Sequence, residues 1–346
     1  WDLTSLTVQL GSVVGDIVNR ISAGAAVAVV STETGDGSHL YRGKFMPGPW
    51  QGFLECFELH YSKGQAPKWE AGRVMYKRNP DSRTIYTSLN NNLVEFSTVN
   101  SAELGYFIAP DGPGSGLDET DAYGPDLDND FDSADEAAGP NFQADYVDDI
   151  IEWVRGEDLA GYRQRGGWLL GDLVHSTPVV VGPPRGFRYD EAFMNFRESW
   201  KYRRSMVYVG SNGGMLHAFN ADTGVEEWAY VPRRVLGKLE LLAEPTYCHQ
   251  SYVDLSPKAY DVEINGSWRT VLVCGLRTGG DSYFAFDVTN PDAPQFLWET
   301  SIPNMKSSYT EPVVVKTHWG TALWAGSGPN PDGKAYSTLI RLDNGN

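Results

Sequence analysis

Short apolar segments separated by glycine and polar turns recur along the chain, and two stretches in its second half repeat the same order of residue types. Residues 206–228 read as an apolar strand, a glycine turn, a second apolar strand ending at Phe219, a polar turn and a tryptophan. Residues 271–298 follow the same order, with Phe286 in the position of Phe219. A chain that repeats a unit of strands builds a radial or stacked array. The pattern therefore predicts an all-β fold made of repeated sheets.

A tryptophan ends each repeat. Trp228 and Trp298 end the two clear copies, and Trp69 ends a weaker copy in which Phe57 takes the aromatic position. Four-stranded units arranged about an axis form a β-propeller, so we predict a modified β-propeller of four-stranded blades. In such a fold each tryptophan lies on an outer strand and packs against the next blade, where truncating it costs about 3 kcal/mol or more.

Each repeat after residue 168 opens with an apolar strand beside a proline. The three prolines are Pro178, Pro257 and Pro312, 79 and 55 residues apart. Proline is tolerated at the start of a strand, because no hydrogen bond of the ladder is lost there. The last repeat ends after a third strand and its turn over residues 339–345, which leaves a sheet edge unpaired. We therefore expect about four blades, the last one incomplete, in a chain that is part of a longer protein or is completed by another segment.

The pattern divides the chain into four stretches. Residues 1–22 are a lead-in, 23–100 the first blade or blades, 101–167 an insertion, and 168–346 the further blades. In the first blades, strands are predicted at residues 26–31, 39–45, 52–60, 72–77, 84–87 and 93–96. In the insertion, residues 101–145 lack apolar periodicity, so we expect a long acidic loop outside the core. Apolar positions over residues 146–154 share one helical face, which predicts a short helix.

A second inserted loop is expected over residues 183–204, where aromatic residues alternate with arginine and lysine. This composition suits a protein-binding surface, since arginine and aromatic residues anchor interfaces. The alternative is an ordered loop that covers one end of its own propeller.

The net charge of −17 is concentrated in one window of the chain. No lysine or arginine lies between Arg83 and Arg155, and this window holds 16 of the 45 acidic residues, which leaves 29 acids against 28 bases elsewhere. A nucleic-acid partner is therefore not expected, because no basic face is available to displace counterions. The longest apolar run, residues 23–30, is too short to span a bilayer, so no transmembrane segment is expected.

The strongest chemical signal is an acidic run within the insertion. Calcium takes about six to eight oxygen ligands, and alternate residues of a tight loop can point inward together. We predict a calcium site formed by Asp126, Asp128, Asp130, Asp132, Ala134 and Glu136. Counting from Asp128 gives carboxylates at positions 1, 3, 5 and 9 and a backbone carbonyl at 7, whereas counting from Asp126 gives a competing register. The alternative is a solvated acidic linker, because the glycine and the final glutamate of a complete EF-hand loop are missing.

Potential catalytic residues do not form a coherent set, so no enzyme is predicted. His175, His217 and His249 each fall near a strand end and are expected in hydrogen-bonded packing positions. The three cysteines form no C-x-x-C pair, which argues against a zinc site. Either a Cys248–Cys274 disulfide or three buried free thiols are expected.

Several strings of the second half resemble one known family. They are Gly171-Asp172-Leu173-Val174-His175-Ser176-Thr177-Pro178-Val179-Val180-Val181-Gly182, Tyr208-Val209-Gly210-Ser211-Asn212-Gly213-Gly214-Met215-Leu216-His217-Ala218-Phe219, Ala229-Tyr230-Val231-Pro232, Tyr252-Val253-Asp254-Leu255-Ser256-Pro257 and Trp268-Arg269-Thr270-Val271-Leu272-Val273. Together they resemble the C-terminal domain of the PilC/PilY family of type IV pilus tip adhesins. The resemblance is specific over residues 168–328, weaker over 20–88 and absent over 101–145.

The resemblance implies a seven-bladed modified propeller that is exported and sits at the pilus tip, extracellularly or at the cell surface. It implies roles in pilus assembly, retraction control and surface adhesion, with calcium bound. The implied partners are minor pilins of the tip complex and a host or abiotic surface.

Two other functions fit the repeat. The Ala-Phe-Asn-Ala-Asp-Thr-Gly unit, followed by tryptophan, also resembles the tryptophan-docking repeat of pyrroloquinoline quinone dehydrogenases, whose paired-cysteine ring has no counterpart among the cysteines of this chain. A propeller that acts only as an assembly scaffold explains the repeat equally well but gives no reason for the acidic run.

Overall fold

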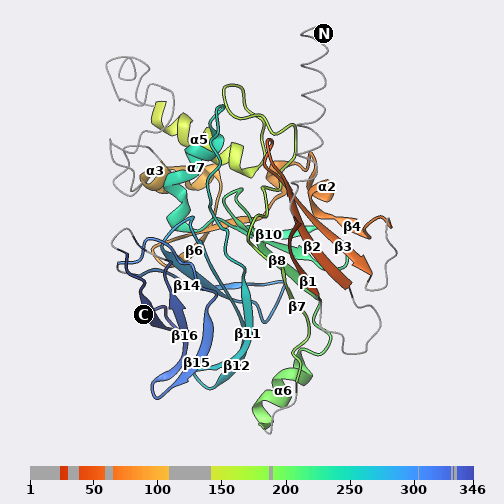
Figure 1. The fold of residues 1–346 in the computed structure, drawn as a ribbon, viewed down its shortest axis with the longest axis vertical. Helices are drawn as coiled ribbons and strands as arrows, with labels where there is room; N and C mark the ends of the chain where they lie inside the picture. Colours follow the sequence, from red (N-terminus) through yellow and green to blue (C-terminus); the bar gives the residue numbers. More distant parts are fainter. Residues whose placement is uncertain are drawn as a thin grey trace.

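The structure, a computed structural model, describes residues 24–29, 39–58, 65–108, 142–186, 190–302, 304–328, 330 and 333–346. Four sheets fan out next to one another, with a group of helices at one end of the molecule and helix α6 (Glu191–Ser199) at the other (Figure 1). The fold is mostly β, and its sheets are arranged like the blades of a propeller whose ring is not closed. The predicted fold class is confirmed.

The first blade is a four-stranded antiparallel sheet whose strands follow the order of the sequence. Its strands are β1 (Gly24–Val29), β2 (His39–Met46), β3 (Gln51–Glu58) and β4 (Trp69–Glu70). One face of this sheet buries Tyr41, Leu54 and Cys56, and these side chains share a core with Val207 and Phe219 of the second blade. The period-two alternation in β2 and β3 therefore separates a face that packs on the next blade from a more polar one.

The second blade has six strands, because a hairpin from earlier in the chain joins its edge. Its strands in spatial order are β6 (Asn92–Glu95), β5 (Ile85–Leu89), β10 (Glu226–Tyr230), β9 (Leu216–Asn220), β8 (Met206–Gly210) and β7 (Val179–Val181). β5 pairs in parallel with β10, and the other pairs are antiparallel. The strands predicted at residues 84–87 and 93–96 exist, and they belong to the second sheet rather than the first.

The third and fourth blades follow in sequence order. The third has β11 (Lys258–Ile264), β12 (Ser267–Gly275), β13 (Ser282–Asp287) and β14 (Gln295–Ser301). The fourth has β15 (Val313–Thr317), β16 (Gly320–Gly326) and β17 (Ser337–Arg341) within the described part of the chain. β7, β11 and β15 each begin one residue after the prolines that mark the starts of the repeats.

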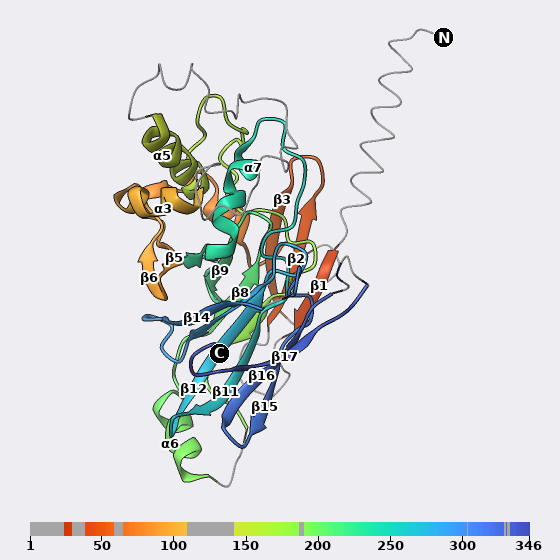
Figure 2. The ribbon, with the colours of Figure 1, turned by 90° about the vertical axis from the view of Figure 1, so that its left-hand side faces the viewer.

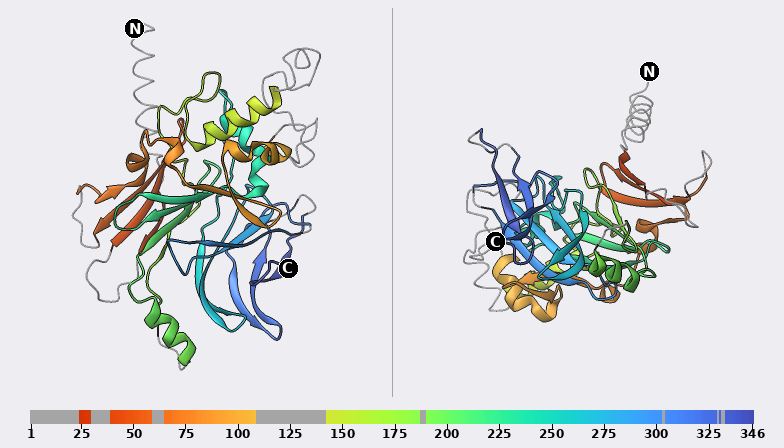
Figure 3. Two further views of the ribbon diagram at one scale, coloured as in Figure 1. Left: turned by 180° about the vertical axis from the view of Figure 1, so that it is seen from behind. Right: turned by 90° about the horizontal axis from the view of Figure 1, so that it is seen from below.

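Helices cluster at one end of the blades, where α3 and α5 lie side by side and α7 packs on α5 (Figures 2 and 3). The described helices are α2 (Ala71–Met75), η1 (Pro80–Ser82), η2 (Thr98–Asn100), α3 (Ser101–Ile108), α5 (Phe142–Arg155), α6, η3 (Arg233–Lys238) and α7 (Leu239–Ala243). The helix predicted over residues 146–154 is part of α5. The predicted lead-in over residues 1–22 lies outside the described residues.

Two predicted elements are wrong. Residues 72–77 were expected as a strand, but Ala71–Met75 is a helix, because the Glu70 carboxylate accepts from the backbone N–H groups of Gly72 and Arg73 and so caps a helical turn. Residues 101–108, expected in a loop outside the core, form α3, whose Leu104 and Ile108 are fully buried. Two apolar residues four positions apart lie on one face of this short helix and pack it against the core.

The segment over residues 183–204 is ordered at its centre and packs on its own propeller. Asp190 caps α6, and its carboxylate also accepts from the indole N–H of Trp268. Phe193 and Phe196 are buried, and the Phe193 ring lies 4.8 Å from the ring of Trp268. Tyr202, which follows the helix, is 88% exposed. This packing fits the alternative in which the segment covers part of its own fold.

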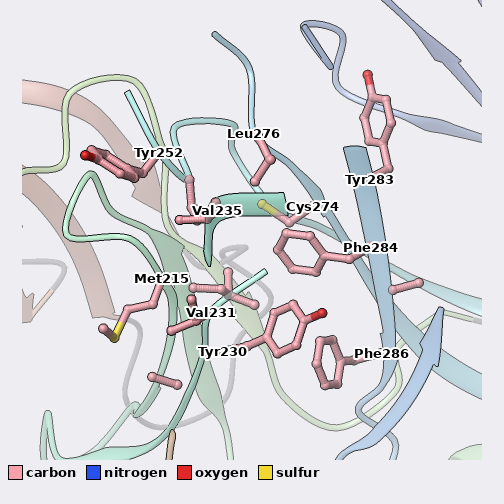
Figure 4. Packing of buried hydrophobic residues seen from close by; sticks show 14 of the residues in the cluster. Met215, Tyr230, Val231, Val235, Tyr252, Cys274, Leu276, Tyr283, Phe284 and Phe286 are labelled. Atoms are coloured by element: carbon pink, nitrogen blue, oxygen red, sulfur yellow. The ribbon is translucent and has the colours of Figure 1, made fainter. Parts of the chain in front are cut away.

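Aromatic side chains fill the space between the second and third blades (Figure 4). The Tyr230 ring lies 5.1 Å from that of Phe284 and 4.9 Å from that of Phe286. The Tyr230 hydroxyl donates to the Glu299 carboxylate, which also accepts from the backbone N–H groups of Arg233 and Arg234 at the start of η3. Strand β14 of the third blade thereby caps a helix that follows the second.

The three cysteines are free thiols. Cys56 and Cys274 are buried in the blades, and Cys248 is exposed. The disulfide alternative is therefore wrong, and burial of free thiols is correct for two of the three.

Candidate functional site

The predicted calcium ligands lie outside the described residues. They are Asp126, Asp128, Asp130, Asp132, Ala134 and Glu136, which fall between α3 and α5. Within the part of the chain that the structure describes, no group of three histidine, cysteine, aspartate or glutamate side chains is placed to hold a metal ion. The calcium site therefore stays a prediction.

The chain segments that flank the acidic run are anchored through two buried arginines. Arg83 donates to the backbone oxygen of Arg155 at the end of α5, at 2.6 Å. Arg155 in turn donates to the backbone oxygens of Phe96 and Arg83, at 2.7 and 3.0 Å. The Arg83 bond satisfies a carbonyl group at the C-terminal end of α5, where a cation is favourable. The Arg155 bonds connect the same end of the helix to the chain at residues 83 and 96. The helix that follows the acidic run is thus fixed to the second blade.

A polar cluster lies where the loops that connect the blades meet, and its centre is a pair of buried carboxylates. Asp172 and Asp254 are each 1% exposed. The side-chain amide of Asn212 donates to Asp172 at 2.7 Å and to Asp254 at 3.4 Å, and its oxygen accepts from the backbone N–H of Tyr252. Buried carboxylates are costly unless they have hydrogen-bond partners, and Asn212 supplies a donor to both. Because Asp172, Asn212 and Asp254 lie in three different segments, the same side chain joins these segments into one unit.

Glycine lets these loops approach one another closely. A Cβ on Gly210 would lie 2.3 Å from the backbone oxygen of Val253, and one on Gly279 would lie 1.9 Å from that of Tyr252. Ser176 then connects the same loops, because its hydroxyl donates to the Leu255 oxygen and accepts from the N–H of Gly210. The glycine turns of the repeat therefore set the positions of the cluster.

His249 belongs to this cluster on the Asp172 side. Its Nε2 lies 3.1 Å from a carboxylate oxygen of Asp172, and its ring stacks on the Trp50 ring with centroids 3.6 Å apart. Trp50 comes from the β2–β3 turn and has a positive φ of 54°. A strained non-glycine residue at a contact of this kind indicates that the surrounding structure holds it in place.

His175 belongs to the cluster on the Asp254 side and faces solvent. Its Nδ1 donates to Asp254 at 2.6 Å, and its side chain is 47% exposed. Arg277 donates to the same carboxylate oxygen at 3.4 Å and to the hydroxyl of Tyr309 at 2.8 Å. The expectation of a packing position is therefore met only in part, because His175 is hydrogen-bonded but half of its ring is open.

His217 is fully buried and forms a second polar network. Its Nδ1 lies 2.7 Å from the Glu226 carboxylate, and its Nε2 lies 3.0 Å from the Ser211 hydroxyl. Arg83 binds both oxygens of Glu226, at 2.8 and 2.9 Å. The order of serine, histidine and carboxylate matches a hydrolase triad, yet all of these side chains are at most 2% exposed. His217 therefore occupies the packing position predicted for it.

Burial and pairing set the charge states of this network. Burial lowers the pKa of His217 and outweighs the opposing effect of Glu226. Burial alone would raise the pKa of Glu226, but the Arg83 guanidinium and the His217 hydrogen bond outweigh it and hold this pKa well below its usual range. The network is thus an Arg83–Glu226 ion pair next to a neutral imidazole.

The sequence reasoning missed Asp172, Asp254, Arg277 and Tyr309. One signal could have found Asp254, because the offset of 79 residues between Pro178 and Pro257 also separates His175 from Asp254 and Ser176 from Leu255. When the two repeats are aligned at this offset, His175 and Asp254 fall at the same position of neighbouring repeats.

Comparisons with known proteins identify relatives for nearly the whole chain. The family model described as the PilY1 beta-propeller domain matches residues 170–325. The type IV pilus biogenesis factor PilY1 of Pseudomonas aeruginosa strain UCBPP-PA14 is 32% identical over 373 residues, which cover 99% of this chain and 30% of that protein. A type IV pilus biogenesis factor PilY1 homolog of Xylella fastidiosa strain Temecula1 is 28% identical over 95% of this chain and 25% of its own length.

Among solved structures, the crystal structure of the Pseudomonas aeruginosa PilY1 C-terminal domain is 33% identical, with a TM-score of 0.41 over 48% of this chain and 35% of that one. The chain spans less than a third of the length of the two PilY1 relatives described above. No described helix is long and apolar enough to cross a membrane.

Proposed function

The chain belongs to the PilY1 β-propeller family, and from that membership we propose that it is the propeller portion of a type IV pilus biogenesis factor. The observation that carries the proposal is the 32% identity to a protein of that name along 99% of this chain. The match includes the blades and the loops that connect them, so the proposal concerns the propeller as a whole.

In this role the propeller binds partners and catalyses no reaction. The described sheets are joined by loops whose glycines allow close backbone contacts, a construction that holds surface loops in fixed positions. The proposed partners are minor pilins at the pilus tip, and the proposed location is the cell surface after export. Adhesion to a host or abiotic surface belongs to the same proposal.

Calcium binding by the acidic run between α3 and α5 is also part of the proposal. The carboxylates at Asp128, Asp130 and Asp132 alternate in the way that calcium loops require. Arg83 fixes α5 to the second blade. A cation bound by the acidic run would therefore lie close to a helix that is already held in place, and it would fix the position of the run relative to the blades. Calcium would then regulate a loop and leave the blade core unchanged.

The test is genetic replacement in the bacterium that produces the protein. Removing residues 168–346 from the full-length protein is expected to reduce the number of surface pili, measured by shearing the cells and quantifying pilin. A matched strain carrying His318→Gln, a change in an exposed turn, is expected to retain wild-type piliation. Unchanged pili, twitching and attachment in the deletion strain, with the truncated protein present at normal level, would refute the proposal.

A further inference from the structure

We propose that His175, Arg277 and Tyr309 form a surface site that binds a carboxylate group. The three residues come from different parts of the fold, since His175 precedes β7, Arg277 follows β12 and Tyr309 precedes β15. The loops bring them together around the buried Asp254. The inference goes beyond the pilus role and does not depend on it.

His175 presents a free ring nitrogen to solvent. Its Nδ1 is used by Asp254 at 2.6 Å, and its backbone N–H donates to the other oxygen of the same carboxylate at 3.1 Å. Nε2 makes no hydrogen bond within the described part of the chain, and the side chain is 47% exposed. A buried carboxylate that holds one nitrogen of an imidazole fixes the direction in which the other nitrogen points.

Arg277 is held beside His175 by the same carboxylate oxygen. Its Nη1 lies 3.4 Å from Asp254 Oδ2, its Nη2 donates to Tyr309, and its guanidinium lies 4.5 Å from the centre of the Tyr309 ring. Its backbone has a positive φ of 56° and donates to the oxygen of Ser308. An arginine with five N–H donors has further donors to offer when two are used. The strained backbone is consistent with a residue placed for binding.

Tyr309 completes the set of donors. Its hydroxyl oxygen accepts from Arg277, so its own hydrogen is available to a ligand. The residue is 39% exposed. Histidine, arginine and tyrosine with fixed orientations lose little conformational entropy when a ligand binds.

The charge of the site favours a singly charged ligand. Of His175, Arg277 and Tyr309, Arg277 carries a permanent positive charge, and its Nη1 lies 3.4 Å from the buried Asp254 carboxylate. On the far side of Asn212, the Asp172 carboxylate lies 3.1 Å from Nε2 of His249. A carboxylate matches one positive charge and two or three donors, whereas a doubly charged phosphate would exceed the charge available.

The test measures binding of small carboxylates to the whole chain. Titrations with acetate, with N-acetyl-aspartate amide and with a short peptide that ends in a free carboxylate are followed through the ¹⁵N signal of His175 Nε2 and by calorimetry. The same peptide with an amidated end, and inorganic phosphate, are the comparison ligands. If acetate binds as tightly as the larger ligands, the site takes a small carboxylic acid. If the aspartate amide binds most tightly, the ligand is an acidic side chain, and if the free peptide does, the ligand is a chain terminus.

Two conservative variants and one matched control complete the test. His175→Gln and Tyr309→Phe are each expected to weaken carboxylate binding by about tenfold, because each loses a hydrogen bond to a charged group. His318→Gln, which changes an exposed histidine elsewhere, is expected to bind as the unchanged chain does. Tyr309→Phe keeps the ring and removes only the hydroxyl, so folding is preserved. Equal binding of the free and amidated peptides, tighter binding of phosphate than of any carboxylate, or full affinity in His175→Gln would overturn the proposal.

Discussion

The indole N–H of Trp298 donates to the backbone oxygen of Leu342 at 2.9 Å, and its ring lies against Gly345. Trp69 makes the same pair of contacts, donating to Ala221 at 3.0 Å and packing on Gly224. Both acceptors begin a turn with an aspartate at its second position and a positive-φ glycine at its fourth. A tryptophan that ends one blade therefore docks on the turn that follows the third strand of the next blade.

Trp228 occupies the equivalent position between the second and third blades but docks differently. Its ring is 3% exposed and lies 5.3 Å from the Phe286 ring, yet its indole N–H has no hydrogen-bond partner among the described residues. After β13 the third blade has Val288-Thr289-Asn290-Pro291, which lacks both the aspartate and the glycine of the turns that begin at Ala221 and Leu342. Without that turn, no carbonyl is presented to the indole.

The first prediction compares these tryptophans. Trp298→Phe is expected to lower the free energy of unfolding by about 1 kcal/mol, because a buried hydrogen bond to Leu342 is lost. Trp228→Phe is expected to lower it less, because the donor that it removes is unpaired. Urea denaturation followed by circular dichroism measures both. An equal loss in the two variants would show that the indole hydrogen bond does not contribute to blade docking.

The second prediction concerns the glycine under the indole. A Cβ on Gly224 would lie 2.6 Å from the Trp69 ring, and the residue has a φ of 72°. Gly266 has a similar φ of 78° with no atom within 4 Å of its would-be Cβ, so it serves as a matched control. Both alanine variants strain the backbone, by about 1 kcal/mol. Gly224→Ala is expected to lose more stability than Gly266→Ala, because the Trp69 ring must also shift. Equal midpoints in thermal unfolding would contradict the role of the close contact.

The tandem repeat made the blades predictable, because each blade is specified by its own strands and turns. The positions of Trp69 at the end of the first blade and of Trp298 in the last strand of the third followed from the repeat of aromatic residues alone. The parallel pairing of β5 with β10 did not, since it joins segments more than 140 residues apart and no local pattern records such a partner. The short helices α2 and α3 were missed because capping by Glu70 and burial of two apolar residues outweighed weak periodicity.

The candidate site was less predictable than the fold. His175 was singled out in the sequence, but its role depends on contacts with Asp254 and Arg277, which lie in the next repeat. A carboxylate becomes a partner for histidine only once the glycine turns bring the loops together. Side-chain networks that join three loops are a property of the folded chain, and residue order alone does not specify them.

The third prediction is a loss of stability in acid that originates at His217. Because the folded state holds the pKa of His217 below that of the unfolded chain, the unfolded state binds more protons as the pH falls below about 6.5. Stability from this group is therefore complete above that pH and declines below it. The depressed pKa of Glu226 acts in the same direction, with its contribution lost as the pH falls below about 4.5.

The measurement is the free energy of unfolding at pH 7 and pH 5 for the unchanged chain and for His217→Gln. The variant is expected to be less stable at pH 7 but to lose less stability between the two values, since its side chain does not titrate. Glu226→Gln is expected to lose about 3 kcal/mol or more at pH 7, because Arg83 is left buried without its charge partner. If His217→Gln loses as much unfolding free energy between pH 7 and pH 5 as the unchanged chain does, other groups cause the acid sensitivity.

The fourth prediction tests calcium binding by the acidic run. Carboxylates as close as Asp128, Asp130 and Asp132 repel one another when no cation is present, so ordering the run without calcium is unfavourable. Chelation is therefore expected to increase proteolytic cleavage between α3 and α5 and to leave the thermal midpoint of the blades nearly unchanged. A variant with all three residues changed to asparagine is expected to be cleaved as fast with calcium as without it. Cleavage of the unchanged chain at the same rate in calcium and in chelator would favour a solvated linker, because a bound cation would have to slow it.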